Sequence, residues 1–125
     1  MPSNPSPLEL RTPKQREGDL VIALQNAVTH AKKNAPYYAE TLADVQSSQI
    51  DSIQALANLP VLRKANLLKI QAAKPPLGGL LAVPINQIRR IFQSPGPIYE
   101  PQGMQTDHFR AARALRAAGF EAGDI

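Results

Sequence analysis

The residues best suited to chemistry lie in the segment FQSPGPIYEPQG, residues 92–103. A turn that binds phosphate offers successive backbone N–H groups, with glycine allowing close approach and a Ser, Thr or Lys side chain completing the contacts. This segment has a suitable serine and glycine, but it also contains Pro95, Pro97 and Pro101, and proline has no N–H to donate. It therefore has the outline of an anion-binding turn without several of the donors.

Composition excludes several other kinds of site. The chain of 125 residues has no cysteine, which rules out disulfides, a thiolate nucleophile and cysteine-ligated metal. The two histidines, His30 and His108, lie far apart without a second ligand at a metal-binding spacing. No apolar run approaches the ~20 residues of a membrane span. We therefore expect a cytoplasmic protein with no membrane partner.

The basic character of the chain raises the question of nucleic acid. The net charge is +4 and the sequence pI is 9.7. Arg110, Arg113 and Arg116 recur every third residue and would share one face of a helix. Without interleaved aromatic side chains, however, this pattern favours a solvated face, and nucleic acid is not the expected partner.

The elements around the segment are predicted to be mainly helical. Thr12, Pro13 and Gln15 form a capping-box pattern, and the apolar periodicity that follows predicts a helix over 13–34. A short second helix should begin at Pro36, with one of its two tyrosines in the core and the other free to be exposed.

Further along the chain, Asp51 is expected to cap a third helix that ends before Pro60, and residues 66–71 to form a fourth. The segment AKPPLGGLLAVP then marks either the passage to extended structure or a mobile loop. Residues 88–92 predict a strand, and a last helix is expected over 106–118 with Gly119 as its left-handed cap.

Read together, these segments resemble the N-terminal part of the phenylacetate–CoA ligase family of adenylate-forming enzymes. The likeness runs from about Thr12 to the end of the chain, and the order and spacing of four segments carry it: HAKKNAPYYAETL (30–42), LANLPVLRKANLL (56–68), PPLGGLLAVPINQIRRI (75–91) and ARALRAAGFEAGDI (112–125). The resemblance implies an α/β protein, here a mostly helical N-terminal piece of an adenylate-forming large domain with a short β-hairpin near 88–102. Residues 1–11 would be a flexible tail, and residues 12–125 the domain part, truncated at its C-terminus.

The family places its phosphate-binding loop, usually Ser-Ser-Gly-Thr-Thr-Gly-Lys-Pro, directly after the predicted strand. The same eight places here read SPGPIYEP, residues 94–101, so the second threonine is an isoleucine, the second glycine is Tyr99 and the lysine is Glu100. The resemblance therefore makes Ser94, Gly96, Tyr99 and Glu100 the candidate nucleotide contacts in a degenerate loop. The favoured interpretation is that the prolines stiffen a hairpin, and the alternative is a site repurposed for another ligand.

The family reaction converts a carboxylate, ATP and CoA into an acyl-CoA. Other groups that this reaction needs lie, in the family, beyond the residues present here, so we expect no ATP or CoA chemistry from this chain alone. Exposed aliphatic surface would then favour self-association or binding to a separately encoded remainder of the ligase. A helical interaction module without catalysis is the alternative.

Overall fold

The computed structural model describes residues 7–124. Of the predicted flexible tail, residues 1–6 lie outside the described residues. The rest of it forms a turn, in which Arg11 Nε donates to the carbonyl oxygen of Leu8 at 2.9 Å. The guanidinium of Arg11 also pairs with the carboxylate of Asp19, which ties this turn to the first helix.

Helix α1, Pro13–Asn34, confirms the longest predicted element. Its N-terminus carries the expected capping box: the Thr12 hydroxyl accepts from the Gln15 N–H at 3.2 Å, and the Gln15 side chain accepts from the Thr12 N–H at 2.8 Å. Pro13 adds a preset φ at a position whose N–H would have no helical partner. Local sequence alone therefore accounts for where α1 begins.

Helix α2, Pro36–Thr41, folds back on α1 and brings the main core together. The core is centred on Val28, Leu42 and Ile50. The prediction of one core tyrosine is confirmed by Tyr38, which packs against this core. Tyr37 is half-buried as well, and the two rings lie edge to face at 5.4 Å. Burial, and secondarily the nearby Tyr37, raises the pKa of Tyr38 above its usual value.

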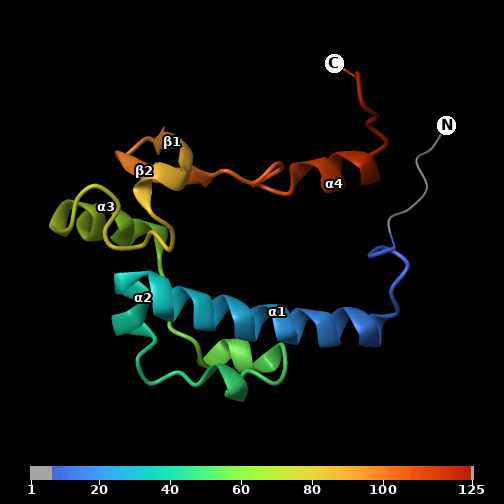
Figure 1. Cartoon of the computed structure of the whole chain (residues 1–125), viewed down its shortest axis with the longest axis horizontal. Coiled ribbons are helices and arrows are strands. Elements are labelled where there is room, and N and C mark those ends of the chain that lie inside the picture. Colours follow the sequence, from blue (N-terminus) through green and yellow to red (C-terminus); the bar gives the residue numbers. More distant parts are fainter. Residues whose placement is uncertain (1–6, 125) are drawn as a thin grey trace.

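The 3-10 turn η2 (Gln54–Asn58) stands where the third helix was predicted, and another 3-10 turn, η1 (Ser47–Gln49), precedes it. Asp51 caps neither turn: the N-cap of η2 is Ile53, without a side-chain cap bond. The Ser52 hydroxyl accepts from the Ala55 N–H at 3.3 Å and donates to Asp51 at 3.1 Å. Both turns lie beneath α1 in Figure 1, and Ala55 and Leu56 of η2 pack against the core.

Helix α3, Lys64–Ala73, is longer than the predicted residues 66–71. The glycine-rich segment after it is packed rather than loose, since Leu77 is 4% exposed. Gly78 has φ +69°, and a Cβ there would lie 2.6 Å from Ile70 Cγ2, so only glycine fits against α3. This segment also connects to the first core, because the Tyr37 N–H donates to the Gly79 carbonyl at 3.0 Å.

The predicted hairpin is present as strands β1, Ile88–Ser94, and β2, Ile98–Gly103. They pair antiparallel with Ser94 opposite Ile98 and Phe92 opposite Glu100, and the register shifts between Ile88 and Arg90. The fold class expected from the sequence, mostly helical with one short β-hairpin, is therefore confirmed.

The last helix, α4, Ala111–Ala117, is shorter than the predicted 106–118. Residues 107–110 form a turn instead, and Asp107 accepts from the Ala112 N–H at 3.1 Å. Arg110 adopts a left-handed conformation with φ 54°, so the expected face of three arginines does not form on one helix. Gly119, with φ +93°, ends the helix as predicted. Its N–H donates to the carbonyl oxygen of Arg116, and the N–H of Phe120 donates to the carbonyl oxygen of Leu115.

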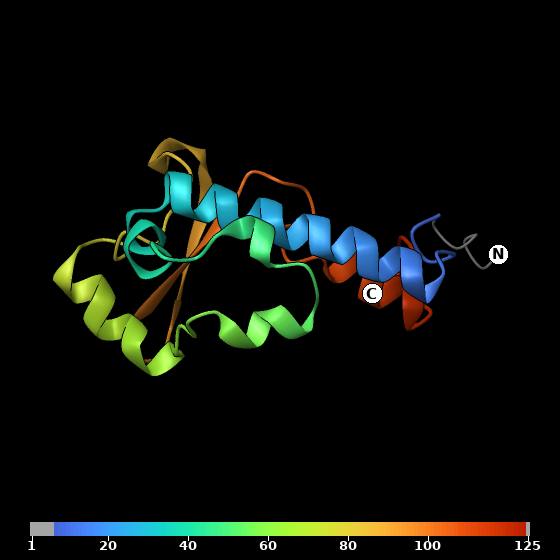
Figure 2. The same ribbon diagram turned by 90° about the horizontal axis from the view of Figure 1, so that it is seen from below.

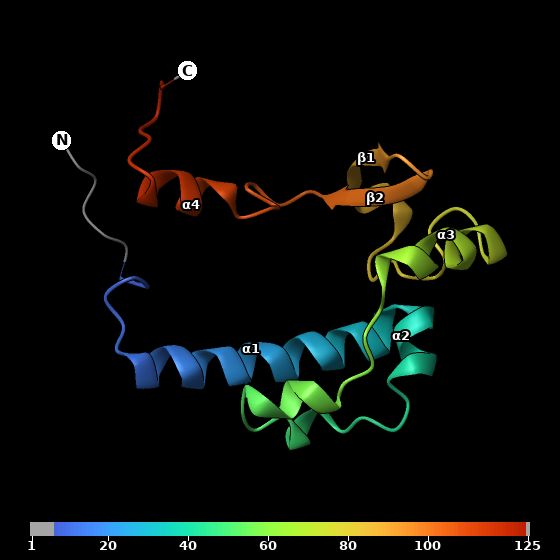
Figure 3. The same ribbon diagram turned by 180° about the vertical axis from the view of Figure 1, so that it is seen from behind.

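The chain is arranged as two arms joined near α2 and α3 (Figure 1). Helix α1 forms one arm, and the hairpin, the segment after it and α4 form the other, so that the start of α1 and the end of α4 lie on the same side. Figure 3 shows the same order from behind, with α1 and α4 apart, and in Figure 2 α4 is seen behind the N-terminal half of α1. Arg113 of α4 links the arms through an ion pair with Glu9 at 3.3 Å.

Candidate functional site

The tip of the hairpin is a three-residue connection, residues 95–97, exposed to solvent. Its central Gly96 has φ +142°, a backbone conformation that other residues rarely adopt. The half-buried Ser94 turns its hydroxyl across the hairpin and donates to the Ile98 carbonyl at 3.4 Å. Between two prolines, Gly96 has the only backbone N–H of these three residues, so the tip presents one donor where a phosphate loop presents several.

Gln71 of α3 holds the strand that follows the tip. Its side-chain Nε2 donates to the Tyr99 carbonyl at 2.8 Å, and its Oε1 accepts from the Tyr99 N–H at 3.0 Å. The amide thus occupies both main-chain groups of Tyr99, as a neighbouring strand would, and it is only 7% exposed. Sequence reasoning missed Gln71, because nothing in the pattern of α3 shows that its polar side chain faces the sheet.

Glu100 forms a second link between the hairpin and α3. Its carboxylate lies 3.2 Å from Lys64 Nζ, with both side chains at least half exposed. An exposed pair of this kind contributes about 0–1 kcal/mol, so its effect is more on charge than on stability. The carboxylate would repel an anion at the tip, and Lys64 partly offsets that charge.

The four sequence-predicted contacts do not converge on one point. Ser94 lies at the end of β1, Gly96 at the tip, and Tyr99 and Glu100 follow each other on β2. Because successive residues of a strand project to opposite faces, the side chains of Tyr99 and Glu100 diverge. A repurposed nucleotide site built from all four residues stays a prediction.

A hollow of about 340 Å³ lies beside the base of the hairpin. Aliphatic residues from the segment before β1 form one wall, and His108 and Met104 lie on the side formed after β2. Within the described part of the chain, Gln102 Oε1 on β2 is buried without a hydrogen-bond donor. The sequence did not indicate this hollow, because its lining comes from segments up to 27 residues apart, from Leu81 to His108.

Two further observations limit the chemistry available in residues 7–124. No group of three His, Asp or Glu side chains comes together there as a metal site would require. In the same range, no helix is both long enough and apolar enough to cross a membrane. In the described residues, α3 and the hairpin thus position a turn without a three-ligand metal site beside it.

Comparison with known proteins identifies the class to which this architecture corresponds. No protein-family model matches the sequence, and neither does any curated protein. The structure matches 2-hydroxyisobutyryl-CoA ligase in the postadenylation state with 2-HIB-AMP, with a TM-score of 0.77 and 26% identity over 90% of this chain. An open conformation of that ligase with 2-HIB-AMP and CoA matches with a TM-score of 0.76 and 27% identity over 89% of this chain.

These matches define the fold as that of part of an adenylate-forming acyl-CoA ligase. The chain spans about a quarter of the length of the solved ligase chains, 25% in both of these structures. The thioesterification state of the same ligase also matches, with a TM-score of 0.65, over 74% of this chain. The structures compared above are all of 2-hydroxyisobutyryl-CoA ligase, and at 26–27% identity the substrate of this chain is a matter for proposal.

Proposed function

We propose that this chain forms part of a phenylacetate–CoA-ligase-like acyl-CoA synthetase, in which carboxylate, ATP and CoA give an acyl-CoA. The observation that carries the proposal is the match to a solved acyl-CoA ligase over 90% of this chain, with a TM-score of 0.77. The four ordered sequence segments lie on the elements that build this fold, from α1 to α4. A cytoplasmic location, with no membrane or nucleic-acid partner, belongs to the same proposal.

We further propose that the chain by itself does not adenylate a carboxylate. Pro95 and Pro97 remove two backbone donors, the Tyr99 N–H is already bonded to Gln71, and Glu100 places a negative charge beside the tip. Hydrogen bonds to charged groups contribute about 1.5–3 kcal/mol each, so losing several of them would remove most of the affinity of a phosphate loop. The contribution of this chain to a ligase would then be structural.

The direct test is pyrophosphate release by the purified chain, with Mg·ATP and CoA and with phenylacetate or 2-hydroxyisobutyrate as the acid. We expect no acid-dependent release above a protein-free control. Isothermal titration with Mg·ATP should likewise give no saturable heat. Release or binding that disappears in Ser94→Ala would overturn the proposal of catalytic silence and would make the hairpin tip a nucleotide contact.

A chimera separates the effect of the loop from the effect of missing groups. In it, this chain replaces the matching quarter of 2-hydroxyisobutyryl-CoA ligase, and a second version carries Ser-Gly-Thr-Thr-Gly-Lys in place of residues 95–100. If the native loop is the obstacle, only the second version should bind Mg·ATP with appreciable affinity. Adenylation by the first version at the rate of the parent ligase would show that the native loop accepts ATP.

The second candidate function is that of an interaction module without catalysis. It is favoured by one observation, the exposure of every described residue from Met104 to Asp124 except His108. Under this alternative, the chimera should be inactive with either loop, although the chain itself still binds a partner. The two candidates therefore differ in the activity of the repaired chimera.

A further inference from the structure

Large apolar side chains remain exposed along the C-terminal arm. Phe109 is 62% exposed and Met104 60%, and Phe92, Leu115 and Phe120 are each at least 43% exposed. We call these five residues the C-terminal apolar surface. Single exposed apolar residues are common on proteins, so the argument depends on whether these five form connected groups.

Ring and cavity contacts connect them into two groups. The rings of Phe92 and Phe109 lie 5.9 Å apart, and His108 meets Phe109 edge to face at 4.9 Å. Met104 and His108 also line the 340 Å³ hollow at the base of the hairpin. At the other end, Leu115 and Phe120 line a second hollow of about 270 Å³. Each apolar group therefore adjoins a depression that a partner side chain could fill.

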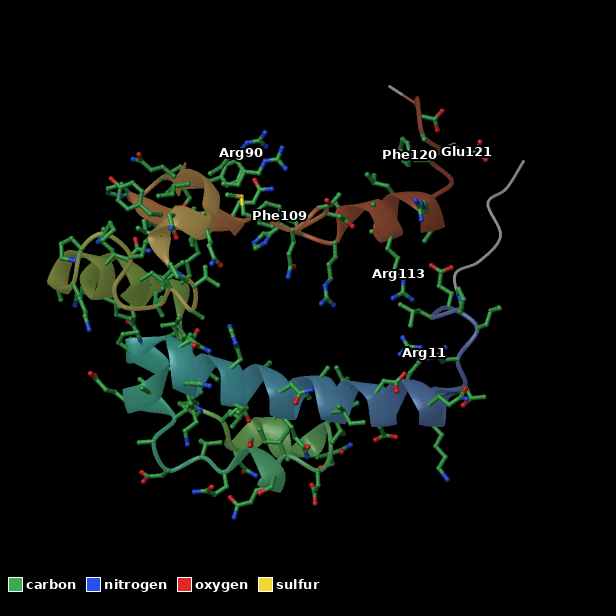
Figure 4. The ribbon with its side chains drawn as sticks, in the orientation of Figure 1. Arg11, Arg90, Phe109, Arg113, Phe120 and Glu121 are labelled. Carbon is green, nitrogen blue, oxygen red and sulfur yellow. The ribbon has the colours of Figure 1, made fainter. Side chains whose placement is uncertain are left out.

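Helix α4 lacks the packing that a stable helix needs. It has seven residues, all exposed, whereas isolated helices shorter than about 12–15 residues are marginal in water. Figure 4 shows Arg113 pointing from α4 toward the N-terminal turn and Phe120 lying on the other side of the helix. The ion pair with Glu9 thus holds one side of α4, and the side near Phe120 is open to a partner.

The charges around this surface are mixed. Between residues 88 and 124 there are five arginines and four acidic residues, a difference of 5 − 4 = +1. The hollow beside Phe120 is lined by Arg116 together with Glu121 and Asp124. A complementary partner would present apolar side chains within a rim that carries both charges.

We propose that the C-terminal apolar surface binds a polypeptide that has the fold of the rest of an adenylate-forming ligase. This inference rests on the proposed function. The solved ligases contain this fold as 25% of their chain, so three-quarters of such a protein has to pack around it. The part of the fold with least packing of its own, α4 and the segment before it, is where that packing is required.

The experiment is capture of the complementary three-quarters of 2-hydroxyisobutyryl-CoA ligase by this chain, without ATP. The variant Phe109→Ser/Leu115→Ser/Phe120→Ser should bind about tenfold or more weakly, because apolar anchors dominate interface energies. The matched control Leu20→Ser/Ile22→Ser/Val61→Ser changes three exposed apolar residues elsewhere and should bind like the unchanged chain.

Equal binding by the two triple variants, or loss in the control alone, would overturn the proposal. So would a dimer of this chain in sedimentation that the first variant abolishes, because the occupant would then be a second copy. The matching quarter of the ligase itself serves as the positive control for a folded probe. If that control fails, hydrogen exchange decides: rapid exchange over residues 111–117 of the free chain supports the need for a partner, and strong protection there contradicts it.

The capture assay and the chimera of the preceding section fail independently. An adenylating chimera combined with no capture, while the positive control captures, overturns the docking surface and leaves the ligase proposal standing. Capture that depends on Phe109, Leu115 and Phe120, combined with a repaired chimera that is inactive, overturns the ligase proposal and leaves the docking surface standing.

Discussion

Helices α1 and α4 lie on opposite arms of the molecule, and they differ in what holds them. Helix α1 has a capping box, 22 residues and a core contact through Val28, which is 8% exposed. Helix α4 has seven residues, a single capping carboxylate from Asp107 and no buried residue. The difference teaches that, among the described residues, the buried cluster of Val28, Leu42 and Ile50 lies with α1, whereas α4 buries none of its side chains.

The largest contrast should appear when a core residue and a surface residue are truncated. Leu42→Ala removes a side chain that is 7% exposed and should lower the free energy of unfolding by about 2–4 kcal/mol. Leu115→Ala on α4 should change it by no more than about 0.5 kcal/mol. Urea denaturation followed by circular dichroism measures both, and similar losses would mean that α4 contributes to the same core.

A smaller effect is expected where the hairpin joins α3. Gln71→Ala leaves the Tyr99 N–H and carbonyl without their partner and should destabilise the chain by about 1–3 kcal/mol. Gln25→Ala is the control. The Gln25 side-chain amide makes one hydrogen bond to the backbone, to the Ile50 carbonyl at 2.9 Å, whereas Gln71 makes two. If Gln71→Ala has no effect on urea denaturation, the hairpin is not part of the cooperative unit.

Removing a capping side chain should also affect α1 and α4 differently. Thr12→Ala removes the cap of α1 and should lower the free energy of unfolding by about 1 kcal/mol. Asp107→Ala removes the acceptor for the Ala112 N–H, but it should only speed hydrogen exchange within α4 and leave global unfolding unchanged. A global loss in Asp107→Ala comparable to that in Thr12→Ala would contradict the comparison.

The smallest expected effect is a loss of stability at alkaline pH. Burial first, and Tyr37 second, raise the pKa of Tyr38 above its unfolded value of 10.0, so the folded chain holds that proton more tightly. The resulting stability is complete below pH 10 and is lost as the pH rises through the raised pKa. Tyr38→Phe should remove this loss, whereas Tyr37→Phe should keep most of it. Thermal unfolding between pH 8 and pH 11 checks this, and equal slopes for all three chains would refute the assignment.

Much of the fold could be predicted from local signals. The capping box sets the start of α1, Gly119 sets the end of α4, and the strand pattern with its prolines indicates the hairpin. The failures occurred where two local signals compete. Ser52, and not Asp51, accepts from the Ala55 N–H at the start of η2. The turn at Asp107 shortened the last helix and removed Arg110 from its face.

The candidate site was predictable only in part. The identities of the tip residues indicate how few N–H donors it has, because proline lacks one in any fold. The clamp of Gln71 on Tyr99 joins residues 28 positions apart and the Lys64–Glu100 pair joins residues 36 apart, so neither leaves a local pattern in the sequence. The hollow beside His108 has the same origin in contacts between distant segments.

The sequence by itself determined the helical composition, the position of the hairpin and the scarcity of donors at its tip, because capping, turn formation and the missing N–H of proline are local properties. Only the tertiary structure decided that Gln71 holds the hairpin and that Lys64 pairs with Glu100. It also decided that the core lies under α1 while the C-terminal apolar surface stays exposed. Burial depends on which segments meet in space, and an apolar residue in a sequence looks the same whether its partner is in this chain or in another.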